Sequence, residues 1–525
     1  MNSRLVNGYW GNMSVIQNIV GPWSKSNIRI ANLAESINMF PETQGQGASA
    51  QSMLRSICGT TTLHDIPGYC RGLYEADKGE DGFPLLFAVY GSKLYVIRTG
   101  NEPEEIYDGL TNINAPVHIC QTGGTKPYLV VVDGANVICV GTYLTTEEMR
   151  STIRSIQLPY RVDSTSQRIQ PTHCAYLYGY LIVNDKGTDA FYTSYQYPFE
   201  TTDEYGQIDW DIFMVNSVQY KDYGFITYSE WAPDNTTALI SNGTLLYTFG
   251  PKSSQIFNYN SDVDMPFVSP SNCANLIGIK APDSLAIVGD YIFYLGSSAI
   301  GENGVYYWRG NQLTRCSTPD VERLIQGFKN PEDARGQTWM ENGHLFYALS
   351  FVNDDYTLVY DVTEQLWHRR STKDAVTNKH HKWRPEYALL HNGKILFGVN
   401  DHIVYMDIHK FTEYDGRPMI RCRRSGVMQT EYNPFIVDGI KLICNAGDFE
   451  NANLMPQIMM RYSESGGPWS NQEIGLLGLQ GEYGTIVEWF NLGIHTCMTM
   501  EFSCSDPIDF AIMAAKIQYK EMDIL

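Results

Sequence analysis

Short apolar runs, joined in pairs by a tight glycine-containing turn, recur along the chain. The first clear pair covers residues 85–90 and 93–97, on either side of Gly91 and Ser92. Runs of β-branched and aromatic residues that flank such a turn predict a β-hairpin. The same pattern surrounds seven turn glycines: Gly91, Gly134, Gly179, Gly243, Gly289, Gly343 and Gly393. The sequence therefore predicts a protein built mainly from antiparallel hairpins.

The spacing of the hairpins indicates how they are arranged. Successive turn glycines lie 43 to 64 residues apart, near or above the roughly 40 to 50 residues that one four-stranded propeller blade requires. One such sheet cannot bury both of its faces, whereas several sheets packed around an axis can, and they leave only short edges. We predict an all-β fold with a β-propeller of about six to seven blades. A large β-sandwich with similar hairpins is the alternative.

The hairpin rhythm divides the chain into three regions. Residues 61–410 carry the rhythm and are predicted to form the propeller, with inserted loops near 194–231 and 251–282 that are rich in Tyr, Asp, Pro and Asn. Residues 1–60 lack a clear period, so we expect an N-terminal arm or a strand that enters and closes the ring. Residues 411–525 contain further alternating stretches, which predict a C-terminal β-sandwich.

Helix signals are few. A capping box over residues 145–148 predicts a helix from 147 to 156. Thr318 is a candidate N-cap, Pro319 suits the first helical position, and Gly327 marks the expected end. We expect both segments to be short helices inserted into the β scaffold.

The composition fits an ordered, acidic protein. The 525 residues include 58 Asp and Glu against 38 Lys and Arg, for a formal net charge of -20, and aromatic residues make up 13%. Few charges and many aromatics argue against disorder. The net charge makes attraction of the whole surface to nucleic acid or anionic lipid unfavourable, although a local basic patch is compatible with it.

Other features bear on location and redox state. No stretch approaches 18 uninterrupted apolar residues, and residues 1–20 lack the basic start and apolar run of a secretory signal. We expect neither a membrane span nor export by the usual signal route. The 11 cysteines include no CxxC pair, which suits reduced thiols packed as small hydrophobic side chains.

The familiar catalytic motifs are absent: HExxH, Gly-x-Ser-x-Gly, GxxxxGK[ST] and a strand-GxGxxG-helix unit. We therefore predict no catalytic, cofactor-binding or metal-binding residues, and no enzyme. His380 and His381 resemble a ligand pair, but neighbours on a strand point to opposite faces, so an exposed basic loop is favoured. The remaining candidates are best explained as carboxylates in Asn- and Asp-rich loops, namely Asp209, Asp211, Asp262 and Asp264.

Two aromatic features favour contacts with protein over chemistry. Residues 463–469 faintly resemble the Asp-box hairpin of sialidase-like propellers but lack the Asp, so we predict a turn with a Trp anchor. A set of tyrosines with no basic residue between them fits a protein interface better than a base- or sugar-stacking surface. This set comprises Tyr192, Tyr195, Tyr197 and Tyr205.

Several short segments together resemble the packaged-DNA stabilisation family of short-tailed bacteriophages, which forms the tail hub or nozzle below the portal and adaptor rings. SINMFPE at 36–42 resembles the start of that family's N-terminal signature, and CSTPDVE at 316–322 resembles its mid-chain helix. The order and spacing of all the segments carry the resemblance, which covers nearly the full chain. The other matching segments are 68–74, 91–96, 358–362, 367–368, 460–463, 466–470, 481–484 and 505–507.

The resemblance implies a structural virion protein of the phage tail, assembled in the host cytoplasm as a ring of six copies. Its expected partners are portal or adaptor ring proteins, tail spikes or fibres, and genomic double-stranded DNA that passes through without sequence readout. An acidic channel wall would repel phosphates and let DNA slide. Two alternatives stay open: a glycan-binding or glycan-cleaving propeller used in receptor binding, and a host-side propeller scaffold for peptides.

Overall fold

The fold was analysed in a computed structural model of the chain, in which two compact units are resolved. One unit combines residues 1–61, 356–383 and 406–525, and the other combines residues 62–355 and 384–405. The structure describes residues 13–17, 19–21, 23–24, 34–44, 51–77, 79–80, 82–111, 113–156, 158, 160–161, 167–199, 226–228, 234–261, 266–270, 273–298, 300–374, 376–377, 379–430, 433–449, 451–464 and 466–522.

Residues 62–355 and 384–405 form a succession of small antiparallel sheets. The first consists of β6 (Cys70–Ala76), β7 (Leu85–Tyr90), β8 (Lys93–Ile97) and β9 (Glu104–Asp108) in that order. The second sheet has the order β10 (His118–Gln121), β11 (Tyr128–Val132), β12 (Val137–Gly141) and β13 (Arg154–Ile156). The third has β14 (Cys174–Leu177), β15 (Tyr180–Asn184), β16 (Ala190–Thr193) and β17 (Ile226–Tyr228). The fourth has β18 (Ala238–Asn242), β19 (Leu245–Phe249), β20 (Ser254–Tyr259) and β21 (Phe267–Val268), with β22 (Ala274–Asn275) beside β20.

Three more groups of strands complete this unit. The first of them is a sheet with the order β23 (Ile277–Ile279), β25 (Tyr291–Ser298), β26 (Asn303–Arg309) and β27 (Gln312–Arg315), with β24 (Ala286–Val288) beside β25. The second is the hairpin of β28 (Ala334–Glu341) and β29 (His344–Phe351). The third is a sheet with the order β33 (Glu386–His391), β34 (Lys394–Val399), β35 (His402–Asp407) and β5 (Gly59–Asp65). All seven predicted hairpin turns join antiparallel neighbours.

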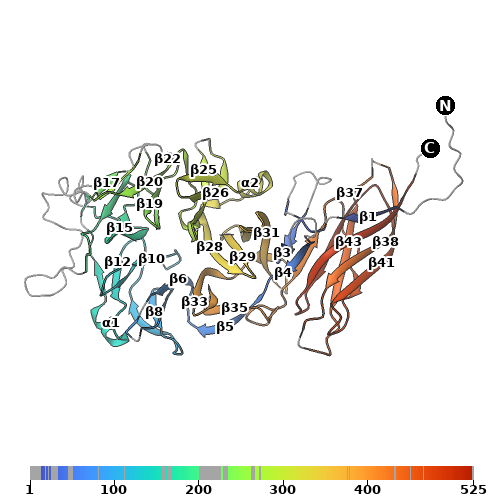
Figure 1. Ribbon diagram of the computed structural model, residues 1–525, viewed down its shortest axis with the longest axis horizontal. Coiled ribbons are helices and arrows are strands. Elements are labelled where there is room, and N and C mark those ends of the chain that lie inside the picture. Colours follow the sequence, from blue (N-terminus) through green and yellow to red (C-terminus); the bar gives the residue numbers. More distant parts are fainter. Residues whose placement is uncertain are drawn as a thin grey trace, which may run out of the picture. The chain divides into compact units, whose positions relative to one another are not determined.

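The strands along the first edge of each sheet, which in one sheet are β23 and β24 together, contact one another in sequence order. Strand β6 contacts β10, β10 contacts β14, β14 contacts β18, β24 contacts β28, β28 contacts β33, and β33 returns to β6. The remaining step is closed by a shared core that includes Ala238 and Ile279. Figure 1 shows the sheets of this unit around a common centre. The predicted β-propeller is therefore confirmed, and the large β-sandwich alternative for this region is wrong.

The last sheet is completed by a strand from near the start of the chain. Strand β5 follows β35 in the sheet order, the Ile66 amide donates to the Asp401 carbonyl over 2.8 Å, and His402 Nδ1 lies 2.8 Å from Asp65 Oδ1. The ring is thus closed by hydrogen bonds between segments more than 330 residues apart.

Alternation along the strands explains why the apolar runs are continuous. In β11 every side chain is buried. Val130 and Val132 pack into a core shared with the β14–β17 sheet, whereas Leu129 and Val131 pack into a core shared with the β6–β9 sheet. Because successive side chains point to opposite faces, a strand covered on both sides needs no polar positions.

The other unit contains two sheets that share one core. The first has the order β3 (Met39–Gln44), β4 (Gln51–Ser56), β43 (Ala511–Glu521), β38 (Phe435–Asn445) and β41 (Gly484–His495), with β1 (Met13–Gln17) beside β43. The second has β30 (Tyr356–Asp361), β31 (Leu366–Lys373), β2 (Ser36–Ile37), β36 (Arg421–Arg424), β42 (Cys497–Cys504), β39 (Gln457–Glu464) and β40 (Glu473–Leu476), with β32 (His380–Lys382) beside β31 and β37 (Met428–Gln429) beside β42. Ile440 and Ile517 of the first sheet join Met460 and Phe502 of the second in this core.

Both predicted helices are present. Helix α1 (Thr146–Thr152) has the full capping box, in which Thr145 and Glu148 cap each other's backbone. It ends four residues before the predicted end at 156, because Ile156 is buried and pairs with Val137 in the sheet. Helix α2 (Pro319–Gln326) has Thr318 as its N-cap and Gly327 as its C-cap, as predicted.

The prediction of an inserted loop near 251–282 was largely wrong, because strands β20 to β23 lie in this segment. Strand β20 supplies the third strand of its sheet, with Ile256 and Phe257 buried, and three shorter strands follow it. The Asp, Asn and Pro residues around these strands favour loops, so the sequence pattern did not indicate strands here. In the segment 194–231, β17 pairs with β16. Four carboxylates and one tyrosine singled out above lie outside the described residues: Asp209, Asp211, Asp262, Asp264 and Tyr205.

The cysteines and the length of the helices bear on two of the expectations from the sequence. All eleven cysteines are free and ten are buried, which confirms the prediction of reduced thiols packed as apolar side chains. In the part of the chain that the structure describes, no helix is long and apolar enough to cross a membrane.

Candidate functional site

A cavity of about 520 Å³ lies in the propeller where turns and first strands of neighbouring sheets meet. The turn between β11 and β12 contributes Asp133 and Gly134, and the turn after β15 contributes Lys186 and Gly187. A cavity that combines opposite charges, backbone and imidazoles in one place is the best-formed candidate for a ligand site in this unit.

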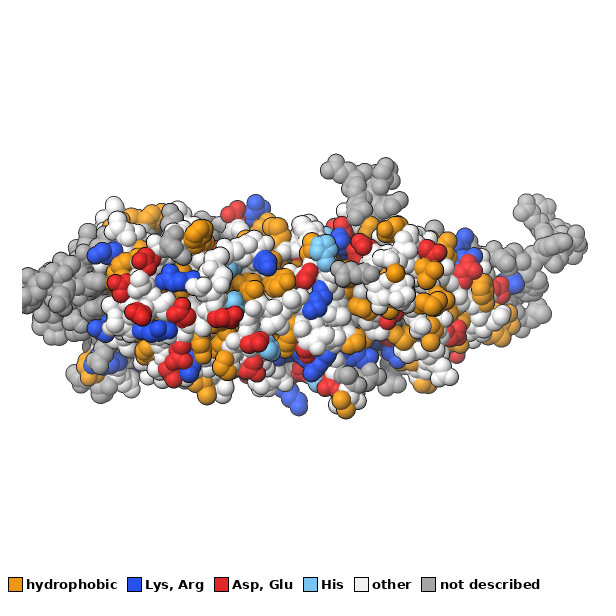
Figure 2. All heavy atoms as spheres, turned by 90° about the horizontal axis from the view of Figure 1, so that it is seen from below, with side chains coloured by type: hydrophobic (Ala, Val, Ile, Leu, Met, Phe, Trp, Pro, Cys, Tyr) orange, Lys and Arg blue, Asp and Glu red, His pale blue; other side chains and the backbone are white. Residues whose placement is uncertain are grey.

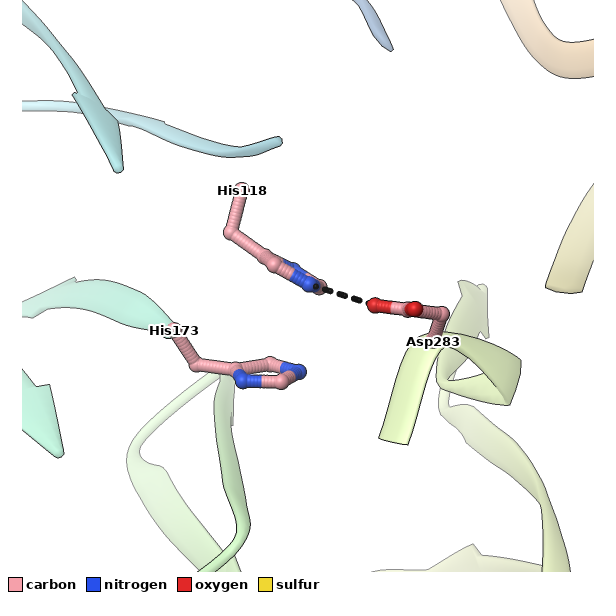
Figure 3. Close-up of side chains that lie close together, drawn as sticks. All are labelled: His118, His173 and Asp283. Carbon is pink, nitrogen blue, oxygen red and sulfur yellow. Dashed lines mark hydrogen bonds and ion pairs between the residues drawn. The ribbon is translucent and has the colours of Figure 1, made fainter. Parts of the chain in front are cut away.

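Three side chains that stand beside three different sheets meet at this cavity: His118, His173 and Asp283 (Figure 3). His118 is the first residue of β10, His173 directly precedes β14, and Asp283 lies in the 3-10 turn η2 (Pro282–Ser284) that precedes β24. His118 Nε2 lies 3.1 Å from Asp283 Oδ1, and the two imidazole centroids are 3.7 Å apart with their planes tilted by 32°. One donor atom from each of the three residues falls within 4.8 Å of the other two.

The surroundings set the charge of the cluster. Burial lowers the pKa of His173 well below its ordinary value of 6.5, and the neighbouring His118 adds to this effect, while Asp283 and the Pro282 backbone oppose it. Burial by itself would raise the pKa of Asp283, but the hydrogen bond from His118 and the electrostatic effect of the two imidazoles and Arg335 outweigh it and lower that pKa. At neutral pH the cluster therefore presents a neutral imidazole at His173 and a carboxylate at Asp283.

The hydrogen bonds of His173 are unequal at its two ring nitrogens. Its Nδ1 lies 3.0 Å from Thr172 Oγ1, which also accepts from Asn184 Nδ2 over 2.8 Å and reaches the Thr237 carbonyl over 3.4 Å. Its Nε2 is buried and makes no hydrogen bond of 3.5 Å or shorter, while the Pro282 backbone lies near enough to the ring to favour its charged form. An unsatisfied buried polar atom costs about 1–3 kcal/mol, so it calls for an explanation.

Comparison with known families decides what kind of protein carries this site. The family described as "Bacteriophage P22 Gp10, beta-propeller" matches residues 33–408, which is well over half of the 525 residues. The chain belongs to this family. Membership makes this Gp10-family protein a bacteriophage structural protein of the tail and a component of the virion, as the resemblance of the short segments predicted.

Comparisons with individual proteins add little to the family assignment. No curated protein matches the chain. Among solved structures, the extracellular domain of BT4673 from B. thetaiotaomicron is 10% identical with a TM-score of 0.38, and the match covers 69% of this chain but only 46% of that one. The N-terminal domain of Nup159 is 10% identical with a TM-score of 0.37, and the match covers 71% of this chain and 98% of that one.

The residues singled out from the sequence do not contribute to this cluster. His380 and His381 lie on β32 in the other unit, where His380 Nδ1 is 2.8 Å from Ser371 Oγ. The Ser463–Trp469 segment closes with a bridge between its two ends, as predicted for a turn with a Trp anchor.

Trp469 is held by two guanidinium groups. The Arg424 and Arg461 guanidinium carbons lie 5.0 and 4.8 Å from the centre of its ring. The predicted tyrosine set is mixed: Tyr192 is buried, whereas Tyr197 is 47% exposed. Among the described tyrosines of the set, Tyr192 therefore does not share an exposed surface with Tyr197.

Sequence reasoning missed the cluster for a geometric reason. The three residues are separated by 55 and 110 positions and share no local motif. Each one stands beside the first strand of a different sheet, and only ring closure brings these strands together. The available signal was positional: in a propeller, polar residues at the starts of first strands converge on the axis.

Proposed function

We propose that this Gp10-family protein is the tail hub or nozzle of a short-tailed phage. Six copies form a ring that extends the portal channel and retains the packaged DNA, and the ring binds portal or adaptor proteins and tail spikes or fibres. The protein acts structurally and not as an enzyme, and it is assembled in the host cytoplasm. The family match over residues 33–408 is the observation that carries the proposal.

An exposed apolar surface supports assembly into a ring. It lies on β40, on β41 and on the segment that joins them, and each of its large side chains is at least half exposed. We call it the β40–β41 surface, and its members are Ile474, Leu476, Leu479, Ile486, Phe490 and Ile494. Exposed large apolar side chains on neighbouring elements are candidates for an interface, and on the outward face of β41 the exposed Glu488, paired with Lys441, lies between Ile486 and Phe490.

The position of β41 in its sheet strengthens this interpretation. Strand β41 (Gly484–His495) is the last in the sheet order, so its outer edge offers unpaired backbone groups as well as apolar side chains. Its burial alternates between inward Val487 and Trp489 and outward Ile486 and Phe490. We propose that a second copy of this chain covers the surface, because a closed ring buries one such face on every copy.

The charge of the protein is compatible with a channel through which DNA slides. The formal net charge is -20, and Figure 2 shows acidic and basic side chains interspersed over the described part of one face. Without a large basic field, phosphates gain little from binding the wall. The ring would therefore retain DNA by closing around it. A channel wall lined mainly by Lys and Arg in the assembled ring would contradict this part of the proposal.

Assembly of the purified full chain tests the proposal. We expect mass photometry and electron microscopy to show rings, alone or with portal and adaptor proteins, and the double variant F490E/I494E to remain monomeric. The matched control is L390E, because Leu390 is similarly exposed at 61% but lies in the other unit. A wild-type protein that stays monomeric and binds no tail component would overturn the proposal.

The glycan-binding or glycan-cleaving alternative is not favoured by the family match. It makes a separate prediction, which is sugar binding by the isolated monomer. Glycan-array binding by a monomer with no affinity for tail components would bring that alternative back.

A further inference from the structure

We propose that His118, His173 and Asp283 bind a divalent transition-metal ion of the zinc class, which joins three sheets of the propeller at its centre. This inference goes beyond the role of the protein as a tail component, and it does not depend on whether the protein forms a ring. The sequence predicted no metal ligands, so the proposal rests on the structure.

The donor set selects the class of metal. Two imidazoles and one carboxylate are the ligands that Zn²⁺ and its first-row neighbours prefer, whereas Mg²⁺ and Ca²⁺ prefer sites made of oxygen atoms. Among the described residues, His118, His173 and Asp283 are the group of at least three such side chains whose donor atoms come this close together. Three protein ligands leave a fourth position, which the cavity keeps open to solvent.

The spacing of the donors fits one ion. Metal–ligand bonds of about 2.0–2.2 Å in a tetrahedron place two ligand atoms about 3.3 Å apart. His118 Nε2 and Asp283 Oδ1 are already 3.1 Å apart, and all three donors fall within 4.8 Å. Figure 3 shows the three side chains converging from separate elements. Side-chain rotations that separate the two tilted imidazole rings and turn their lone pairs toward one point would complete the set.

The unpartnered nitrogen of His173 provides the second, independent observation. The side chain is 3% exposed, and Nε2 makes no hydrogen bond of 3.5 Å or shorter. When Nδ1–H donates to Thr172 Oγ1 and the Thr172 hydroxyl donates to the Thr237 carbonyl, the Nε2 lone pair remains free. Metal-ligating imidazoles typically donate the N–H of their other ring nitrogen to a fixed acceptor, and Thr172 Oγ1 would be that acceptor here. A bound ion would satisfy the buried nitrogen.

The position of the site suggests what the ion does. Its ligands belong to the sheets that begin with β10 and β14 and to η2, which packs against β28. An ion that binds only the folded propeller stabilises the folded state by mass action, so bound Zn²⁺ would oppose the separation of these sheets. The proposed role is structural, since it needs only the three ligands and water in the open position.

Metal content of the full-length protein is the direct test. After treatment with a chelator and dialysis against Zn²⁺, we expect mass spectrometry to find one Zn²⁺ per chain. At a Zn²⁺ concentration about 100-fold above Kd, the Tm is expected to rise on the order of 3 °C, whereas Mg²⁺ and Ca²⁺ are expected to leave it unchanged. Co²⁺ substitution should give the visible absorption of a site with nitrogen and oxygen ligands.

Variants assign the site to these residues. We expect D283N and H173Q to lose the bound Zn²⁺ and the rise in Tm. The matched control is H402Q, which removes a histidine paired with one carboxylate, Asp65, outside the cluster; it is expected to keep both. If H173Q fails to fold, D283N and the Co²⁺ spectrum of the wild type still decide. Zn²⁺ that does not bind the wild type, or that binds D283N equally well, would overturn the proposal.

Discussion

Arg335 Nη1 lies 2.9 Å from Glu386 Oε2, and this ion pair joins β28 to β33, the first strands of two successive sheets. The two side chains are only 12% and 7% exposed. Tyr69 adds a third contact, since its hydroxyl donates to the same carboxylate oxygen over 3.0 Å. Because this largely buried guanidinium has its ion pair with Glu386, the packing of these two strands is sensitive to the loss of that carboxylate charge.

E386Q is therefore expected to lower the free energy of unfolding by about 3 kcal/mol, because it leaves the largely buried Arg335 without its ion-pair partner. Chemical denaturation measures this loss. The control is E105Q, which breaks the exposed ion pair of Lys93 and Glu105 and is expected to change stability little. Equal effects of the two variants would show that the Arg335 pair is not buried in solution.

A buried amide in the unit that contains both termini supplies the second prediction. Asn38 Nδ2 donates to the carbonyls of Ser371 and Ile420 over 2.8 and 2.9 Å, and Asn38 Oδ1 accepts from the Ser371 amide over 2.9 Å. N38A removes all three bonds and leaves their partners buried, so we expect a loss of about 3 kcal/mol or more.

N38G separates the hydrogen bonds from the backbone, because Asn38 has a φ of 55° that glycine accepts without strain. We expect N38G to recover about 1 kcal/mol relative to N38A, as measured by denaturant unfolding. Full recovery in N38G would show that backbone strain, and not the amide, accounts for the loss.

The third prediction concerns pH. Burial lowers the pKa of His380 to about 4, and the charges of Arg369 and Lys373 act in the same direction, while Glu35 and Glu501 oppose it. Between the ordinary value of 6.5 and about 4, the unfolded chain binds a proton that the folded protein excludes. Stability is therefore expected to fall as the pH is lowered through this window.

H380Q tests this origin. It should reduce the slope of the free energy of unfolding against pH between 6.5 and 4, measured by urea titrations at several pH values, while the buried His173 keeps its own contribution to that slope. A curve of unchanged slope in H380Q would assign the pH dependence to other groups.

A close backbone approach gives the fourth prediction. A Cβ added at Gly336 on β28 would overlap the backbone of Ser284 in η2, the turn that carries Asp283. G336A is expected to displace η2 and to cost about 1–3 kcal/mol, as overpacking does. G484A is the control, because nothing lies within 4 Å of its added Cβ. Thermal unfolding compares the two, and similar Tm values would argue against a tight packing of η2.

The sequence predicted the hairpins because their signals are local. Turns at Gly91 and Gly343 require positive φ, with values of 56° and 83°, and glycine adopts them without strain. The caps at Thr145 and Thr318 were equally visible, since each cap acts within four residues. Signals of this range fix the type of an element before any tertiary contact forms.

Features that depend on ring closure could not be predicted in this way. Strand β20 lies among polar residues, and its pairing with β19 gives it a place in the sheet. The cluster of His118, His173 and Asp283 exists only because separate sheets converge. Neither feature has a sequence period or spacing of its own.

The completion of the last sheet by β5 has a consequence for synthesis of the protein. Asp65 leaves the ribosome early, but its partner His402 is made more than 330 residues later. At about 5–20 residues per second, this interval lasts roughly 20–70 s. During that time the propeller of the growing chain is not closed, and apolar faces that are buried between neighbouring sheets in the finished protein are exposed to solvent. The yield of chains with a closed propeller is therefore expected to depend on the chaperones of the host cell.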